Sequence, residues 1–113
     1  MATSGQPHYI CSVSDISPEK PYVFNLKDKI EIVVFQLKNN YFALENRCPH
    51  AGAKLNEGIL EDNILTCIWH GWKFDIESGQ CLNEYWAKIQ TFSVILQGEE
   101  LYLHNIDEDK LFL

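Results

Sequence analysis

The sequence predicts an all-β domain built from small antiparallel sheets. Two observations favour this fold class: short runs rich in β-branched and aromatic residues recur along the chain, and turn-forming residues separate them. The chain has 113 residues, the size of one domain, and its apolar fraction of 46% is sufficient for a core. We therefore expect a flexible tail at residues 1–7 and a single domain over residues 8–113.

In the first half of the chain, four runs read as strands. The segment 17–21 contains two prolines, which exclude a helix there and indicate a turn. Residues 38–40 include two asparagines, which tolerate positive φ angles, so they indicate a hairpin turn. The four expected strands are residues 9–13, 22–26, 30–37 and 41–44.

In the second half, two less regular stretches, 45–57 and 67–72, alternate with short strands. We expect hairpins around residues 61–63, 77–79 and 97–99, where acidic, amide or glycine residues cluster. Two segments, 13–17 and 83–88, would accommodate a short helix. The strands expected in this half are residues 59–60, 64–66, 74–76, 80–82, 89–96 and 101–104.

Charge and hydropathy exclude several classes of function. The formal net charge is -7, which argues against binding to nucleic acid or to anionic membrane surfaces. Such a surface suits a basic protein partner, or it serves solubility alone. We see no signal peptide and no apolar run long enough to span a membrane, so a cytoplasmic location is expected.

The residues that carry chemistry are two mixed pairs, Cys48 with His50 and Cys67 with His70. Sixteen residues separate the pairs, enough for a hairpin that would bring their loops together. Thiolates and imidazoles favour zinc or iron–sulfur chemistry over calcium or magnesium. Both loops contain glycine, which lets the backbone approach a cluster closely.

Two other interpretations remain open at this point. The cysteines could be small buried apolar residues and the histidines ordinary polar side chains. The four residues could also form a structural zinc site, although common zinc motifs pair Cys with Cys and His with His. The mixed pairs better suit a binuclear cluster in which one iron takes both cysteines and the other takes both histidines.

With these motifs the sequence resembles the Rieske iron–sulfur proteins. The segments CPHAGAKLNEG (48–58) and CIWHGWKFDIESG (67–79) are similar to the two cluster-binding loops of that family. The resemblance implies three small antiparallel sheets, with a two-loop cluster-binding subdomain, about residues 45–74, at the tip. It further implies one [2Fe-2S] cluster per chain, with Cys48 and Cys67 on the inner iron and His50 and His70 on the outer iron.

Departures from the family pattern indicate which kind of Rieske protein this is. The respiratory and photosynthetic members carry an extra disulfide, whose cysteines would fall at Ala53 and Trp69, and hydroxyls that would fall at Trp72 and Phe74. Fewer hydrogen bonds to cluster sulfur predict a potential near the low end of the family range, about -150 mV.

The resemblance is therefore strongest to the Rieske-type ferredoxins of oxygenase systems. It implies a one-electron carrier, not itself an enzyme, between a flavin-dependent reductase and a terminal oxygenase, and we expect this carrier to be a monomer. The alternative is a small subunit of a larger oxidoreductase, such as nitrite reductase. The other cysteines and histidines are expected to pack or to contact solvent and not to bind metal: Cys11, Cys81, His8 and His104.

Overall fold

The computed structural model describes residues 7–27, 30–49, 52–68 and 71–104, and its strands form three antiparallel sheets. This confirms the predicted fold class. Residues 1–6 of the expected tail, the residues His50, Trp69 and His70, and the C-terminal residues 105–113 lie outside the described residues. In the described part of the chain, no helix has the length and apolar character needed to cross a membrane.

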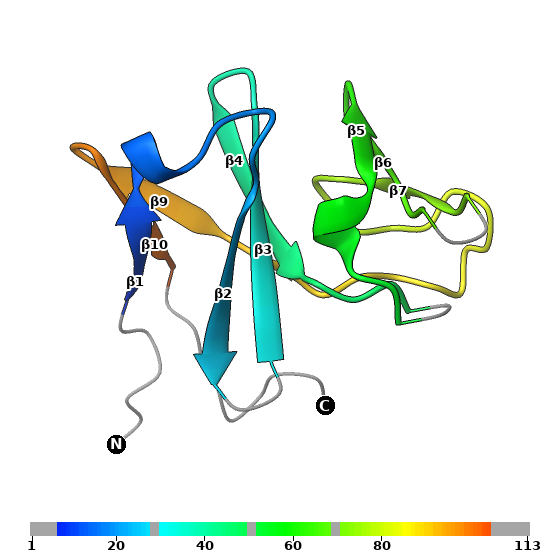
Figure 1. Cartoon of the computed structure of the whole chain (residues 1–113). Coiled ribbons are helices and arrows are strands. Elements are labelled where there is room, and N and C mark those ends of the chain that lie inside the picture. The colour runs from blue at the N-terminus through cyan, green and yellow to red at the C-terminus, as the bar shows by residue number, and fades with distance from the viewer. Residues whose placement is uncertain (1–6, 28–29, 50–51, 69–70, 105–113) are drawn as a thin grey trace.

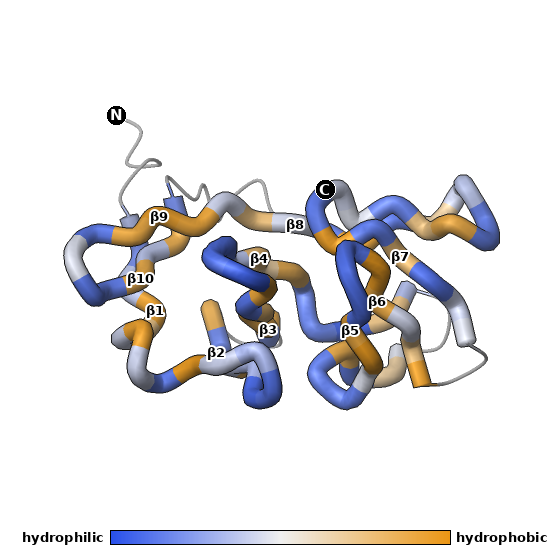
Figure 2. Tube along the Cα trace, turned by 90° about the horizontal axis from the view of Figure 1, so that it is seen from above, coloured by the Kyte–Doolittle hydropathy of each residue, from blue (hydrophilic) through white to orange (hydrophobic). Residues whose placement is uncertain are grey.

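Each sheet contains three or four strands, and the four-stranded sheet lies between the other two, as Figures 1 and 2 show from two directions. Two 3₁₀ turns, η1 (Val13–Asp15) and η2 (Leu55–Glu57), lie between strands. The first sheet consists of β1 (His8–Ser12), β10 (Glu100–Leu103) and β9 (Val94–Gln97). The middle sheet consists of β2 (Tyr22–Lys27), β3 (Ile30–Leu37), β4 (Asn40–Glu45) and β8 (Thr91–Phe92). The third sheet consists of β5 (Ile59–Glu61), β6 (Ile64–Thr66) and β7 (Lys73–Asp75).

The middle sheet is buried on both faces, which explains why β3 is an almost continuous apolar run. Successive side chains of a strand point to opposite faces. Ile32 and Val34 belong to a hydrophobic cluster that also contains residues of β1 and β10. Val33 and Phe35 belong to a second cluster, which also contains residues of β6 and β7. The strand β3 therefore supports the first sheet on one face and the third sheet on the other.

The third sheet lies within a segment that leaves the middle sheet and returns to it at the same strand. The chain leaves β4 after Glu45 and comes back as β8, which pairs with β4. At this junction the backbone N–H of Glu45 donates to the carbonyl of Gln90 at 2.9 Å. Residues 46–90 thus begin and end side by side.

Three tight hairpins whose loops lie within the described residues have a common backbone feature. Each has a two-residue loop whose first residue has a positive φ: Lys38 (58°), Asp62 (56°) and Gly98 (64°). The turns predicted around these positions are confirmed. In the first hairpin, however, the positive φ falls on Lys38 and not on the neighbouring asparagines.

Three sequence predictions are wrong in detail. Residues 89–96 do not form one strand, because the chain passes from the middle sheet to the first sheet at Ser93, between β8 and β9.

Residues 80–82 make only isolated bridges, and residues 83–88 form no helix. The side-chain amide of Gln80 donates to the carbonyls of Cys81, Tyr85 and Ala87, so residues 80–88 close into a loop around it. The expected helix at 13–17 is the single turn η1, capped by Ser12.

Candidate metal centre

The structure brings Cys48 and Cys67 into one hydrophobic cluster. Their exposed fractions are 0% and 1%, and the cluster also contains Ala53, Leu65 and Phe74. All four cysteines of the chain are among the described residues, and none forms a disulfide. Burial in apolar surroundings limits the access of water to both sulfur atoms, and such surroundings tune the properties of a bound metal.

The two loops that carry these cysteines close in the same way. The N–H of Cys48 donates to the carbonyl of Ala53, and the N–H of Cys67 donates to the carbonyl of Trp72, both at 2.8 Å. Each hydrogen bond therefore joins the cysteine to the fifth residue after it. In each loop the residue before the acceptor is a glycine with positive φ, Gly52 (74°) or Gly71 (67°). The shared C-x₃-G spacing in the sequence is the signal of this common closure.

The third sheet fixes the position of the second loop. Cys67 follows β6 and Trp72 precedes β7, and these two strands pair with Thr66 opposite Lys73. The first loop is followed by η2, whose Leu55 is fully buried in the same cluster. After η2 the backbone passes very close to β6: a Cβ atom added to Gly58 would lie 2.5 Å from the carbonyl oxygen of Thr66. Both loops therefore extend from the same small sheet.

Aromatic side chains cover the second loop. Phe74 is fully buried, and its ring centroid lies 6.5 Å from that of Trp72. Trp72 is half-buried and meets the ring of Trp86 edge-on, with centroids 5.7 Å apart. Trp86 itself is 65% exposed and donates its indole N–H to Glu84 at 3.2 Å. An aromatic path therefore runs from the buried cysteines to the surface.

Two of the four predicted ligands, His50 and His70, lie outside the described residues. The described residues accordingly contain no group of three or more His, Cys, Asp or Glu side chains that could hold a metal ion. The positions of His50 and His70 in the sequence place them within the two closed loops, after Cys48 and Cys67 respectively. Their role as ligands stays a prediction.

The cysteines and histidines that were not expected to bind metal have other environments. Cys11 is buried in the other hydrophobic cluster, on the far side of the middle sheet, and burial raises its pKa to about 11. Cys81 is buried with Cys48 and Cys67, and its sulfur accepts the N–H of Glu84 at 3.4 Å. His8 stacks on Phe24, with centroids 5.9 Å apart, rather than simply facing solvent. His104 is exposed, and its backbone N–H donates to the backbone carbonyl of Ser93 at 2.9 Å.

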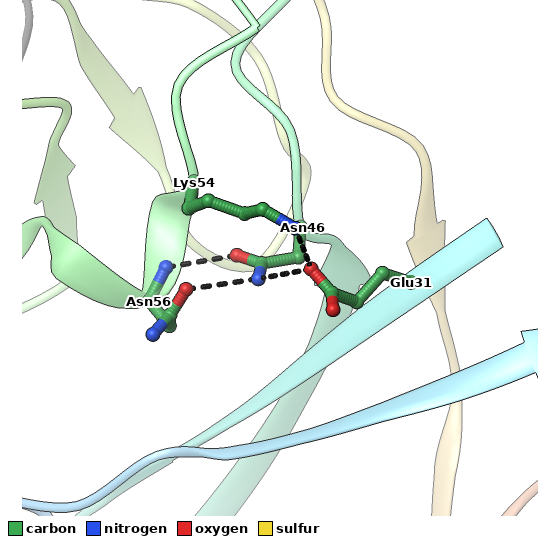
Figure 3. Close-up of polar contacts among 4 residues, drawn as sticks. All are labelled: Glu31, Asn46, Lys54 and Asn56. Atoms are coloured by element: carbon green, nitrogen blue, oxygen red, sulfur yellow. Dashed lines mark hydrogen bonds and ion pairs between the residues drawn. The ribbon is translucent and has the colours of Figure 1, made fainter. Parts of the chain in front are cut away.

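Sequence reasoning missed one part of the site, the side chain of Asn46. It lies two residues before Cys48 and is 3% exposed. It is hydrogen-bonded to Glu31 and Asn56, and Lys54 joins the same network (Figure 3). No motif signals this network, because Glu31 belongs to β3 and the other three residues flank the first loop.

The described residues fit a cluster held by soft donors. Two thiols are buried in one apolar cluster, and each begins a closed loop with a left-handed glycine. Soft thiolate ligands select zinc, copper(I) and iron–sulfur clusters over hard cations. The backbone conformation of the two loops and the burial of their cysteines are thus compatible with the binuclear cluster that the sequence motifs predict.

Comparisons with known proteins agree with this chemistry. A family model described as the Rieske [2Fe-2S] domain matches residues 6–93. The ferredoxin component of the alkene monooxygenase system of Xanthobacter autotrophicus is 31% identical over 90 residues, which cover 79% of this chain and 73% of that protein.

Two examples illustrate the solved structures that share the fold. One is the ferredoxin of carbazole 1,9a-dioxygenase from Nocardioides aromaticivorans, with a TM-score of 0.78, 22% identity, and coverage of 88% of this chain and 97% of that one. The other is assigned to the small subunit of an NADH-dependent nitrite reductase from Mycobacterium tuberculosis, with a TM-score of 0.80, 16% identity, and coverage of 90% and 96%.

Proposed function

Since the chain belongs to the Rieske [2Fe-2S] domain family, we propose that it binds one such cluster per chain through Cys48, Cys67, His50 and His70. The two cysteines would bind one iron as thiolates, and the two histidines would bind the other through imidazole nitrogens. A bound cluster of this type supplies one-electron redox chemistry. The buried apolar residues around Cys48 and Cys67 exclude water from the sulfur side of the site.

We propose that the protein carries single electrons from a flavin-dependent reductase to a terminal oxygenase. The observation that carries this proposal is the match to the ferredoxin component of an alkene monooxygenase system, which extends over most of both proteins. The relative is a separate electron-transfer component and not a catalytic one. By the same argument, the chain acts as a carrier and not as an enzyme, and we expect it to be a monomer.

The surface beside the second loop is suited to contact with a redox partner. Three apolar side chains of the loop closed by Gln80 are exposed: Leu82 by 55%, Tyr85 by 90% and Trp86 by 65%. Trp86 contacts Trp72, which closes the loop of Cys67. A partner that covers these side chains would stand next to the proposed cluster, where the distance for electron transfer is short.

We further propose a low reduction potential. The family members with high potential place hydroxyl groups at the positions of Trp72 and Phe74, and neither side chain here has one. Hydrogen bonds to cluster sulfur stabilise the added electron, so their absence favours about -150 mV. A measured midpoint above about +100 mV would contradict this part of the proposal.

The second candidate function is a small subunit of a larger oxidoreductase. The nitrite reductase subunit mentioned above has the same fold at a TM-score of 0.80, so the fold does not separate the two functions. Its identity of 16% is lower than the 22% of the carbazole dioxygenase ferredoxin in the same comparison of structures, which favours the carrier. Size-exclusion chromatography after co-expression with neighbouring oxidoreductase genes separates them, because a carrier elutes alone.

The cluster is tested by comparing two sets of cysteine variants. We expect anaerobically purified protein to contain about two iron and two acid-labile sulfide per chain and to be red-brown. Cys48→Ser and Cys67→Ser should lose both, whereas the matched controls Cys11→Ser and Cys81→Ser, at equally buried positions, should retain them. Zinc with no sulfide in the unmodified protein would overturn the proposal.

The carrier role is tested with purified components. The reduced protein should give the low average g-value of mixed Cys and His ligation in electron paramagnetic resonance. It should also be reoxidised by an oxygenase in the presence of oxygen and substrate. A protein with an intact cluster that remains reduced when mixed with oxygenases, but co-purifies with a reductase complex, would support the subunit function instead.

A further inference from the structure

Asn46 is the one polar or charged side chain that is buried among the described residues, with 3% of its surface exposed. A buried amide is costly unless its hydrogen-bonding groups are satisfied. Asn46 satisfies them: its Nδ2 donates to Oε1 of Glu31 at 3.0 Å and to Oδ1 of Asn56 at 2.9 Å, and its Oδ1 accepts the backbone N–H of Asn56 at 2.8 Å.

These bonds join both ends of the first loop to the middle sheet. Asn46 precedes the loop and Asn56, in η2, follows it, so the Asn46–Asn56 pair closes the segment that contains Cys48 (Figure 3). Glu31 lies in β3. Its carboxylate accepts a hydrogen bond from the side-chain amide of Asn46, and its backbone carbonyl accepts one from the backbone N–H of Asn46 at 2.8 Å.

Lys54 adds a charged contact to the same carboxylate. Its Nζ donates to Oε1 of Glu31, the oxygen that also accepts from Asn46. This hydrogen bond is the main reason that the pKa of Glu31 lies below its ordinary value, so the carboxylate is ionised at neutral pH. The Lys54 side chain is 54% exposed, so the ion pair itself contributes little to stability. The buried amide is the group through which loop and sheet are coupled.

We propose that Asn46 is a positioning residue for the cluster: through Glu31 and Asn56 it holds the first loop, and hence Cys48, at a fixed distance from the middle sheet. This inference rests on the proposed function and adds to it a residue that binds no iron. Because the loop also contains His50, a shift of the loop would change the ligands of both irons. The second loop is positioned by the pairing of β6 with β7, which lie on either side of it.

The test compares Asn46→Ala with two variants that separate its contacts. Asn46→Ala removes all three side-chain hydrogen bonds. Glu31→Gln removes the charge that Lys54 contacts but keeps a carbonyl oxygen to accept from Asn46. Asn56→Ala removes the hydrogen bond from Asn46 Nδ2 to Asn56 Oδ1 but keeps the one from the backbone N–H of residue 56 to Asn46 Oδ1. It is therefore a milder variant, available if Asn46→Ala does not fold.

We expect Asn46→Ala to shift and broaden the g-values of the reduced cluster and to release iron to a chelator about tenfold faster, which is the lower end of the effect known for groups bonded directly to metal ligands. Asn56→Ala should show a smaller change in the same direction, and Glu31→Gln should retain the original spectrum. In the apoprotein, the rate of hydrogen exchange at the backbone N–H of Asn56 should rise in Asn46→Ala but not in Glu31→Gln, because only the first variant removes the acceptor of this N–H.

Two outcomes would overturn the inference. One is an Asn46→Ala protein that unfolds more easily but retains the original g-values and rate of iron release, which is the behaviour of a residue important only for stability. The other is a Glu31→Gln protein as perturbed as Asn46→Ala, which would assign the effect to the charge. Absence of any cluster from the unmodified protein would instead contradict the proposed function, so the two failures are distinguishable.

Discussion

The chain passes close to Gly79 a second time at residues 89–91. Replacing Gly79 by alanine tests whether this close approach stabilises the fold. Gly79 has a φ of +80°, and an added Cβ atom would lie 2.2 Å from the carbonyl oxygen of Ile89 and 2.9 Å from Cγ2 of Thr91. Gly98 is the matched control, because its φ is +64° and its Cβ position has no neighbouring atom within 4 Å. The two positions share the backbone conformation and differ in the space available.

The structure gives different magnitudes for the two variants. Alanine in a left-handed conformation costs about 1–2 kcal/mol, and the lower entropy of the unfolded chain offsets about 0.4–1 kcal/mol. Gly98→Ala should therefore lower the free energy of unfolding by about 1 kcal/mol. In Gly79→Ala the Ile89 carbonyl must also move. This movement strains the 2.8 Å hydrogen bond from the backbone N–H of Ile89 to the carbonyl of Gly79, and it disturbs the packing of the Ile89 side chain, which is 2% exposed. These two effects add about 2–4 kcal/mol.

Thermal unfolding at one fixed scan rate measures the difference. It should be followed by circular dichroism and by the visible absorbance of the cluster. For a domain of this size 1 kcal/mol corresponds to roughly 4 °C, so we expect losses of about 4 °C for Gly98→Ala and about 12 °C or more for Gly79→Ala. Equal losses, within about 2 °C, would show that the close approach of Ile89 is relieved without cost and would refute the reasoning.

Three further predictions concern the site and its surroundings. Tyr85→Ser and Trp86→Ser should each raise the KM of the oxygenase for this protein about 5- to 30-fold, because each variant loses an aromatic anchor of the proposed interface. The paramagnetic resonance spectrum of the cluster should stay the same, and an unchanged KM would exclude this surface as the partner contact. Phe74→Tyr should raise the midpoint potential by about 20–60 mV in protein-film voltammetry, because a new hydroxyl donor favours the reduced state by about 0.5–1.5 kcal/mol; a lower or unchanged midpoint with a full complement of iron would contradict the low-potential argument. Since burial raises the pKa of Cys11 to about 11, this residue should remain a neutral thiol at pH 8 and react slowly with iodoacetamide, and labelling should become faster as the pH approaches 11. Peptide mass mapping measures the rate of labelling, and rapid labelling of Cys11 in the folded protein at pH 8 would refute this prediction.

Local sequence signals predicted most strands, because each strand has its own alternation or its own apolar run. The strand β3 is an instructive case: the run from Ile32 to Phe35 is apolar at every position, and the structure shows why, since alternate residues enter two different clusters. The convergence of Cys48 and Cys67 was also predictable from their spacing on either side of a hairpin.

The errors have a common physical cause, which is that long-range contacts decide between locally equivalent conformations. The alternation in residues 89–96 fits one strand as well as two, and only pairing partners in different sheets separate β8 from β9. The loop after Gln80 depends on one side-chain amide that reaches three carbonyls. Glu31 and Asn46 are fifteen residues apart, so their contact leaves no periodic signal.

The hydrogen bond between Glu45 and Gln90 has a consequence for how such proteins can change over evolution. Because residues 46–90 begin and end at adjacent points on one sheet, the electron-transfer unit can be lengthened, shortened or exchanged as a cassette without altering the order of the host strands. A graft between relatives should therefore be joined at these two positions, and the new segment should also preserve the contacts that Glu31, Val33 and Phe35 of β3 make with the segment it replaces.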